Sequence, residues 1–289
     1  MFDICCIGHI TQDRVVTPKS VKYMAGGTAY YFSCALANLD INYKLITAVG
    51  DSELYYVEQL REDGIDVDSH PSSQTVYFEN IYGHNPDDRK QNVLAVADAF
   101  DAQRLNSIKA KIFHLGPLLD TDIPIEVIRL LASKGLVSVD VQGYLRQVIN
   151  KKVIPSIWDN AKRALPFVHT IKADENELSM LTGCDTVHDG VKKLADLGVK
   201  EIIVTNGSKG SLIYCDNEFY QIPAFAPKII LDATGCGDTY MAGYLYSKIK
   251  GMNSVNCGRF AAAMASLKME QYGAFTGDKN QILNFLSKQ

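Results

Sequence analysis

Short apolar runs alternate with longer amphipathic segments along most of the chain. The runs are rich in β-branched and aliphatic residues, as buried strands are, whereas the longer segments repeat apolar residues every three or four positions, as helices do. We expect strands at 4–7, 44–49, 111–115, 136–140, 168–173 and 201–205, and helices at 28–39, 53–63, 123–133, 154–164 and 187–197. Strands that are apolar on both faces belong in a parallel sheet between helical layers, so this rhythm predicts an α/β fold.

The last third of the chain continues the pattern with short strands around 212–222. Three helices are then expected at 237–250, 255–271 and 281–287. No internal repeat, low-complexity tract or flexible linker interrupts the 289 residues, and this length suits one large domain. We therefore expect a single domain over residues 1–289.

Two segments depart from this rhythm. Residues 14–24 and about 70–96 carry alternating β-type patterns with polar turns between them. Short strands inserted between α/β units predict a small sheet that projects from one edge. In an enzyme such a sheet would be a lid over the site; the alternative is a hairpin extension with no role in chemistry.

Composition and charge argue against several classes of protein, among them nucleic-acid-binding and membrane proteins. Hydrophobic residues make up 47% and charged residues 21%, and the formal net charge is −4, which disfavours nucleic acid or an anionic membrane as a partner. No apolar run approaches the roughly 18 residues of a membrane span. The chain starts in an expected strand without a basic leader. The seven cysteines form no CxxC pair and no zinc spacing, so we expect a cytoplasmic protein.

The segment that is richest in chemistry is DATGCGDTYMAGY, residues 232–244. Gly235, Cys236 and Gly237 are small residues directly before a helical pattern, where free N–H groups and the helix dipole favour an anion such as phosphate. Asp238 falls in the first helical turn. It could cap the helix, or it could take a proton from an attacking hydroxyl group. No GxxxxGK[ST] motif occurs, and no GxGxxG follows the first strand.

Five segments in order resemble the ribokinase-like (PfkB) carbohydrate kinase family. DATGCGD at 232–238 is similar to the family pattern D-T-x-G-A-G-D. The other four are GHITQDR (8–14), GGTA (26–29), KADENELSMLTG (172–183) and VTNGSKGSLIY (204–214). The resemblance covers nearly the whole chain. It implies a three-layer α/β/α fold with a mostly parallel sheet and a small β lid, and an ATP- and Mg²⁺-dependent kinase.

The resemblance also implies roles for individual residues. The catalytic set is Asp238 as general base, with Gly235, Cys236 and Gly237 as the anion hole. The substrate-binding set is Asp13, Gly26, Gly27, Asn80, Tyr82, Asp140, Gln142 and Arg146. The nucleotide-binding set is Asp174, Thr205, Gly207, Ser208, Gly210 and Gly273, and Glu177 is expected to act on Mg²⁺ through water. A K⁺ site near Asp232 and the turn at Gly273 is a further expectation.

Three positions depart from the family pattern. Asp174 stands where the family usually has Asn, which adds a negative charge near the nucleotide. Tyr31 stands where an Asn commonly follows the Gly-Gly turn, so this turn does not predict a ribose-like binding mode. Cys236 replaces the usual Ala and is interpreted as a packing residue.

The segment DVQGYLR, residues 140–146, bears on the substrate. It resembles the D-x-Q-x-x-x-R segment of the family's inositol kinases more than the N-P-A of ribokinases, and it is also similar to the D-x-N-x-R of fructokinase-like members. We therefore expect phosphorylation of a small sugar or cyclitol. The alternatives are a ribo-, fructo- or nucleoside kinase, or a sensor that binds without turnover. A homodimer through the edge of the small sheet is also expected.

Overall fold

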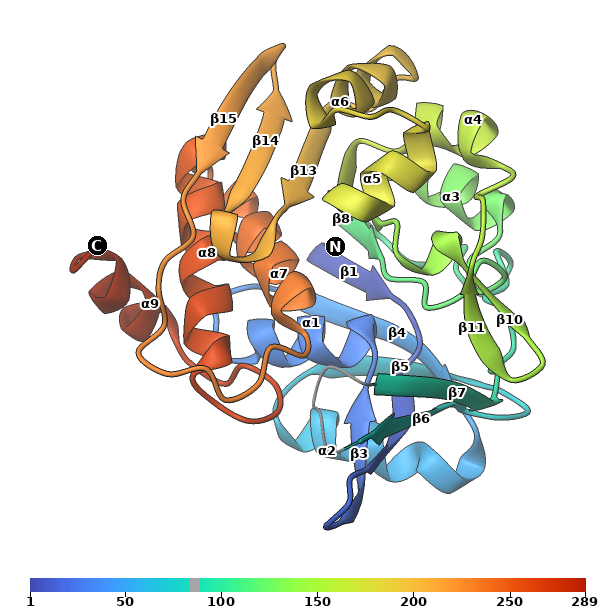
Figure 1. Cartoon of the computed structure of the whole chain (residues 1–289). Helices are drawn as coiled ribbons and strands as arrows, with labels where there is room; N and C mark the ends of the chain where they lie inside the picture. Colours follow the sequence, from blue (N-terminus) through green and yellow to red (C-terminus); the bar gives the residue numbers. More distant parts are fainter. Residues whose placement is uncertain (84–88) are drawn as a thin grey trace.

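The computed structural model describes residues 1–83 and 89–289; residues 84–88, inside the expected lid, lie outside the described part. Within that part, nine strands form the main sheet (Figure 1). In spatial order they are β15 (Glu218–Ile222), β14 (Ser211–Cys215), β13 (Glu201–Thr205), β12 (Thr170–Asp174), β9 (Leu136–Asp140), β8 (Ala110–Leu115), β1 (Phe2–Ile7), β4 (Tyr43–Val49) and β5 (Asp66–Pro71). All pair in parallel except β14 and β15, which confirms the expected mostly parallel sheet.

Helices cover both faces of this sheet, and a separate apolar core lies between the sheet and each helical layer. One layer contains α1 (Thr28–Ala37), α2 (Leu54–Glu62), α7 (Cys236–Ile249) and α8 (Ser254–Met269), with α9 (Lys279–Leu286) against α8. The other contains α3 (Ile125–Ala132), α4 (Ala161–Ala164), α5 (Glu175–Thr182) and α6 (Val187–Asp196). No helix in the described part of the chain is long and apolar enough to cross a membrane.

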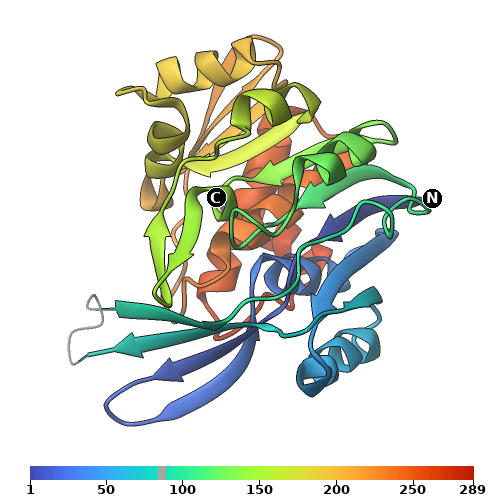
Figure 2. The same cartoon turned by 90° about the vertical axis from the view of Figure 1, so that its right-hand side faces the viewer.

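A second sheet projects from the edge of the main body (Figure 2). Its order is β10 (Arg146–Ile149), β11 (Lys152–Pro155), β7 (Arg89–Ala95), β6 (Val76–Tyr82), β2 (Thr11–Val16) and β3 (Val21–Gly26). The two segments that break the α/β rhythm supply β2, β3, β6 and β7, although residues 70 and 71 still belong to β5 of the main sheet. That this sheet acts as a lid stays a prediction.

The hairpin β10–β11 corrects one expected element. A helix was expected over 154–164, but residues 152–155 form β11 and only 161–164 are helical. Asn150 and Lys151 both have positive φ angles, as a tight two-residue hairpin turn requires. Val148 and Val153 then pack on the core of the second sheet, against a cluster that includes Phe78. Tertiary burial therefore outweighs the local helical pattern.

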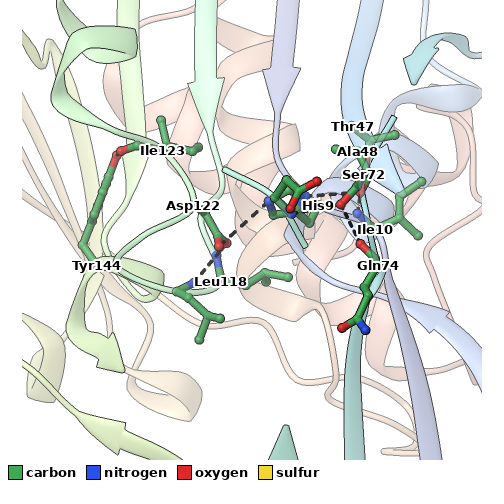
Figure 3. A network of polar contacts seen from close by, with 12 residues as sticks. His9, Ile10, Thr47, Ala48, Ser72, Gln74, Leu118, Asp122, Ile123 and Tyr144 are labelled. Carbon is green, nitrogen blue, oxygen red and sulfur yellow. Dashed lines mark hydrogen bonds and ion pairs between the residues drawn. The ribbon is translucent and has the colours of Figure 1, made fainter. Parts of the chain in front are cut away.

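A buried polar network joins the two sheets (Figure 3). His9, between β1 and β2, contacts the carbonyl oxygen of Ala48 at 3.3 Å through Nδ1, and its Nε2 lies 3.9 Å from Asp122 Oδ1. The other oxygen of Asp122 accepts the backbone N–H groups of Leu118 and Leu119. Leu118 packs in the apolar core of the second sheet. The network therefore fixes the base of the second sheet to the main body.

Candidate active site

A cavity of about 480 Å³ opens where neighbouring parallel strands end. Asp140 ends β9, Asp174 ends β12 and Thr205 ends β13, and the beginning of α7 faces the same edge. Ligands in open α/β sheets bind at this edge. The expected site residues that line the cavity are Asp140, Gln142, Asp174, Glu177, Thr205, Gly207, Gly235, Cys236, Gly237 and Asp238.

The turn before α7 has the geometry that its small residues predict. Gly235 is the N-cap residue with a φ angle of 77°, in the left-handed region. A Cβ atom there would also lie 2.3 Å from the ring of Tyr31, so only glycine fits. The first N–H groups of a helix lack intrahelical partners, although the Cys236 N–H donates to the Ala233 oxygen at 3.3 Å. Gly237 and Asp238 follow in the first turn.

Asp238 is half-buried in the cavity. Burial raises its pKa to about 7, and the negative charge of Asp140 acts in the same direction. Lys172, a hydrogen bond from Thr28 and the charge of Arg146 oppose this shift. The carboxyl group is therefore partly protonated near neutral pH and can exchange a proton there.

Lys172 is a cavity residue that the motifs did not single out. Its Nζ donates to Asp140 Oδ2 at 2.9 Å, and both side chains are buried. The ammonium also lies 3.0 Å from where a Cβ atom of Gly237 would be. Burial disfavours the charged form, but Asp140, Glu177 and Asp238 outweigh burial and hold the pKa of Lys172 above the ordinary lysine value. A lysine inside an apolar central strand, T-I-K-A-D, was the available signal.

Glu177 and Asp174 form a capping box at the start of α5. The Asp174 carboxylate accepts the Glu177 N–H at 2.7 Å, and Glu177 Oε2 accepts the Asp174 N–H at 2.8 Å. Gln142 Nε2 donates to the other oxygen of Glu177 at 3.2 Å. These bonds hold the Glu177 carboxylate toward the cavity that it lines.

The cavity can take Mg²⁺ through water rather than in a cage of side chains. Among the described residues, no group of three or more His, Cys, Asp or Glu side chains could hold a metal ion. Mg²⁺ usually keeps several waters and shares its ligands with substrate phosphates. The fixed carboxylate of Glu177, together with the room in the cavity, fits this mode of binding.

A second cavity of about 470 Å³ adjoins the first and is mainly apolar. Thr205, Gly207, Cys236 and Gly237 line both cavities, so the two lie next to each other. The expected nucleotide residues Ser208 and Gly210 line the second one. Its apolar walls, which the motifs did not predict, come from Ala224, Phe225, Pro227, Ile230, Ala262 and Met269.

The expected substrate residues on the second sheet lie outside the lining of these two cavities. Asp13 Oδ1 accepts a hydrogen bond from Thr11 at 2.7 Å, and Gly26 and Gly27 join β3 to α1 beside it. Asn80 and Tyr82 alternate along β6 and so share one face. Asn80 accepts a hydrogen bond from Gln91 at 3.0 Å.

Tyr31, on α1, packs against the turn before α7. Its ring is buried against Gly235, and its hydroxyl oxygen has no hydrogen-bond partner in the part of the chain that the structure describes. Burial and the charges of Asp13, Asp232 and Asp238 raise its pKa. The structure therefore brings Asp13 and Asp238 around one buried phenol, although they are distant in sequence.

The expected K⁺ site does not fit the residues present. Gly273 does reach Asp232, because its N–H donates to Oδ2 at 3.2 Å. The ammonium of Lys268, however, already contacts that same oxygen at 2.9 Å and the Asp232 carbonyl oxygen at 2.8 Å. A second cation at these oxygens would meet the charge of Lys268 at close range.

Comparisons with known proteins agree with this geometry. Residues 1–280 match the family described as pfkB family carbohydrate kinase. The cytidine kinase of Thermococcus kodakarensis is 27% identical over 94% of this chain and 98% of its own length. A pyrophosphate-dependent kinase in the ribokinase family, complexed with a pyrophosphate analog and myo-inositol, has a TM-score of 0.84 at 26% identity, covering 97% of this chain and 99% of its own.

Arabidopsis thaliana ribokinase complexed with ribose and ATP shares the fold, with a TM-score of 0.81 at 23% identity over 99% of this chain and 98% of its own. ATP is the usual phosphate donor in the ribokinase family, typically with Mg²⁺, although the pyrophosphate-dependent kinase above belongs to the same family. The family and fold that the five segments predicted are thus confirmed. The chain belongs to the pfkB family and is a carbohydrate kinase with the ribokinase-like fold.

Proposed function

We propose that this chain transfers the γ-phosphoryl group of ATP to a hydroxyl group of a small sugar or cyclitol, with Asp238 as general base. The observation that carries the proposal is the position of Asp238. It lies in the first turn of α7, half-buried in the cavity that Lys172 also lines, with a pKa of about 7. A base with that pKa can accept a hydroxyl proton at neutral pH.

The reaction needs stabilisation of negative charge beside this base. The hydroxyl oxygen bonds to the γ-phosphorus, its proton passes to Asp238, and ADP leaves. Gly235, Cys236 and Gly237 present the N-terminal end of α7 to the phosphoryl group, and the Lys172 ammonium lies next to Gly237. These fixed charges and dipoles stabilise the negative charge on the phosphoryl group in the transition state of the transfer.

The two adjacent cavities support a nucleotide as donor. The apolar cavity suits the adenine ring, while Thr205, Gly207, Ser208 and Gly210 would contact the ribose and phosphates at its junction with the polar cavity. Glu177 would hold Mg²⁺ through water, with Asp174 fixing its orientation. The bound ion would neutralise phosphate charge.

The acceptor would bind between the main body and the second sheet. Asp13 would accept hydrogen bonds from two hydroxyl groups of the acceptor, beside Gly26 and Gly27. Arg146 is close enough for its charge to lower the pKa of Asp238, and it would contact the phosphoryl group during transfer. Asn80 and Tyr82 would face the acceptor from β6. We assign Asp140 and Gln142 a positioning role, because they hold Lys172 and Glu177.

The acceptor class rests on two observations. The 140–146 segment resembles inositol kinases, and a structural neighbour with a TM-score of 0.84 is complexed with myo-inositol, so a cyclitol is our first choice. The similarity to a cytidine kinase supports a nucleoside as the second. In either case we propose one kinase domain over residues 1–289, with the second sheet as its lid.

The deciding experiment is phosphorylation of a panel of inositols, pentoses, hexoses and nucleosides, with Mg²⁺ and either ATP or pyrophosphate as donor. We expect turnover with ATP and one acceptor. Asp238→Asn should fold and lose on the order of 10² to 10⁴ in turnover, the range for a general base. Asp159→Asn, which changes an exposed aspartate outside the lining of both cavities, is the matched control and should be fully active.

Each outcome has a distinct meaning. Near-wild-type turnover by Asp238→Asn would rule out the general base. Turnover with pyrophosphate but not with ATP would show that pyrophosphate is the phosphate donor, and the proposed chemistry at the acceptor hydroxyl group would still hold. Binding of a non-hydrolysable ATP analogue by calorimetry, with no turnover on the whole panel, would favour the sensor.

A further inference from the structure

Lys268 lies in the last turn of α8 and is fully buried. Most lysines in proteins are exposed to solvent. Its Nζ donates to the carbonyl oxygen of Asp232 at 2.8 Å and to Asp232 Oδ2 at 2.9 Å. A buried ammonium is costly unless it is paired and hydrogen-bonded. We therefore expect the ammonium group of Lys268 to have a role that a shorter apolar side chain could not take.

The Lys268–Asp232 pair joins three segments that meet beside the phosphate site. Asp232 Oδ1 accepts the Thr234 N–H at 2.9 Å, and Oδ2 also accepts the Gly273 N–H at 3.2 Å. One residue earlier, the Leu231 N–H donates to the Met269 oxygen at 2.8 Å. The end of α8 and the turn after it thus hold the loop that leads into α7.

This loop determines where the phosphate-binding turn lies. Only two residues separate Asp232 from Gly235, so a shift of Asp232 would move the first N–H groups of α7. The charges of Lys268 and Asp232 both act on the Cys236 side chain within that turn. A displacement of about 1 Å in such a turn can cost on the order of 100-fold in rate.

We infer that the Lys268 ammonium is a built-in cation that holds the phosphate-binding turn in position, so that this kinase works without a monovalent cation. An alkylammonium and K⁺ carry the same charge and are similar in size. Lys268 already contacts the two Asp232 oxygens to which K⁺ would bind. Lys268 is thus a positioning residue, and its role rests on the proposed function of the Gly235–Gly237 turn.

The first test uses the wild-type protein in chloride salts of K⁺, Na⁺ or choline at equal ionic strength, about 0.1 M. We expect kcat, the KM for ATP and the melting temperature Tm to be the same in all three salts. A rise in kcat of about tenfold or more in K⁺ over choline would overturn the inference.

The second test removes the ammonium. Lys268→Ala leaves space beside Asp232, and in choline it should lose on the order of 10- to 100-fold in kcat. K⁺ or methylammonium should restore much of that loss and raise Tm, whereas choline is too large to enter. Full activity of Lys268→Ala in choline would also overturn the inference.

A matched control is Lys248→Ala. Lys248, near the other end of α7, pairs with the buried carboxylate of Glu201, so this variant also breaks a lysine–carboxylate pair, but far from the turn. Its kcat should stay independent of the cation. If Lys268→Ala does not fold, Lys268→Ser leaves similar space beside Asp232, adds a hydroxyl oxygen that can contact a cation, and should show the same K⁺ dependence.

The Tm measurements separate this inference from the proposed function. A protein that phosphorylates nothing on the panel fails the proposed function. A cation-independent wild-type Tm with a K⁺-stabilised Lys268→Ala would still support the built-in cation. A wild-type Tm that rises in K⁺, in a protein with normal turnover, would overturn the built-in cation alone.

Discussion

Asp238 and Lys172 line one cavity. Their surroundings shift both pKa values, so that Asp238 can exchange a proton near neutral pH while Lys172 stays charged. Burial and Asp140 raise the pKa of Asp238 to about 7, whereas three carboxyl groups keep Lys172 charged despite burial. Burial also disfavours ionisation of Asp140, but the adjacent Lys172 outweighs it and holds the pKa of Asp140 below the ordinary value. One carboxyl group is therefore tuned to exchange a proton while its neighbour remains an anion.

A pH profile tests this pairing directly. The proposed base must be deprotonated, so kcat/KM should fall tenfold per pH unit below a midpoint near 7 in the wild type. Initial rates from pH 5 to 9 with saturating donor would measure it. The control variant Asp159→Asn should give the same curve. A profile that stays flat down to pH 5 would contradict the raised pKa of Asp238.

Helix α5 shows how one element serves both stability and the site. Its capping box satisfies N–H groups at the helix start, and the same bonds orient the Glu177 carboxylate toward the cavity. The family resemblance assigns Asp174 to the nucleotide-binding set. The structure adds that its carboxylate already caps the helix, and Asn, the usual family residue, is an equally good N-cap.

Substitutions at Asp174 distinguish the cap from the charge. Asp174→Ala should lower the free energy of unfolding by about 0.5 to 2 kcal/mol, because it removes the N-cap acceptor. Asp174→Asn keeps an acceptor and should remain close to wild type. Urea unfolding of both variants would measure the difference. Equal stability of the Ala and Asn variants would show that the cap contributes little.

In the part of the chain that the structure describes, the second sheet has an edge strand at each end of its strand order. β3 lies at one end and β10 at the other, and each carries exposed apolar side chains. Val21 and Tyr23 on β3 are 48% and 57% exposed. Unpaired strand edges favour pairing with another chain, so β3 is our candidate for a dimer contact.

Light scattering on size-exclusion fractions tests the dimer. We expect the wild type to elute as a homodimer and Val21→Lys, which places a charge on β3, to shift toward the monomer. Ile149→Lys changes a residue of similar exposure on β10 and should leave the dimer intact. A wild type that is monomeric at all concentrations would remove this prediction, and dissociation by Ile149→Lys alone would move the contact to β10.

Most helices and strands could be predicted because local patterns specify them. The apolar strands, the glycine turn before α7 and the five family segments depend on short stretches of backbone and side chain. They led to the main sheet, the kinase family and the position of Asp238. The hairpin at 146–155 was not predicted because Val148 and Val153 become buried through tertiary contacts, against a cluster to which β6, β7 and Leu118 contribute.

The charge network of the site could not be derived from the same patterns. Lys172 meets Asp140 from 32 residues away, and Lys268 meets Asp232 from 36. Strand register and helix packing bring these groups together and bury both lysines, and burial away from water strengthens each charge-assisted hydrogen bond. Local sequence therefore specifies which elements form and which motif carries the chemistry, while the packing of distant elements sets the charges and pKa values around it.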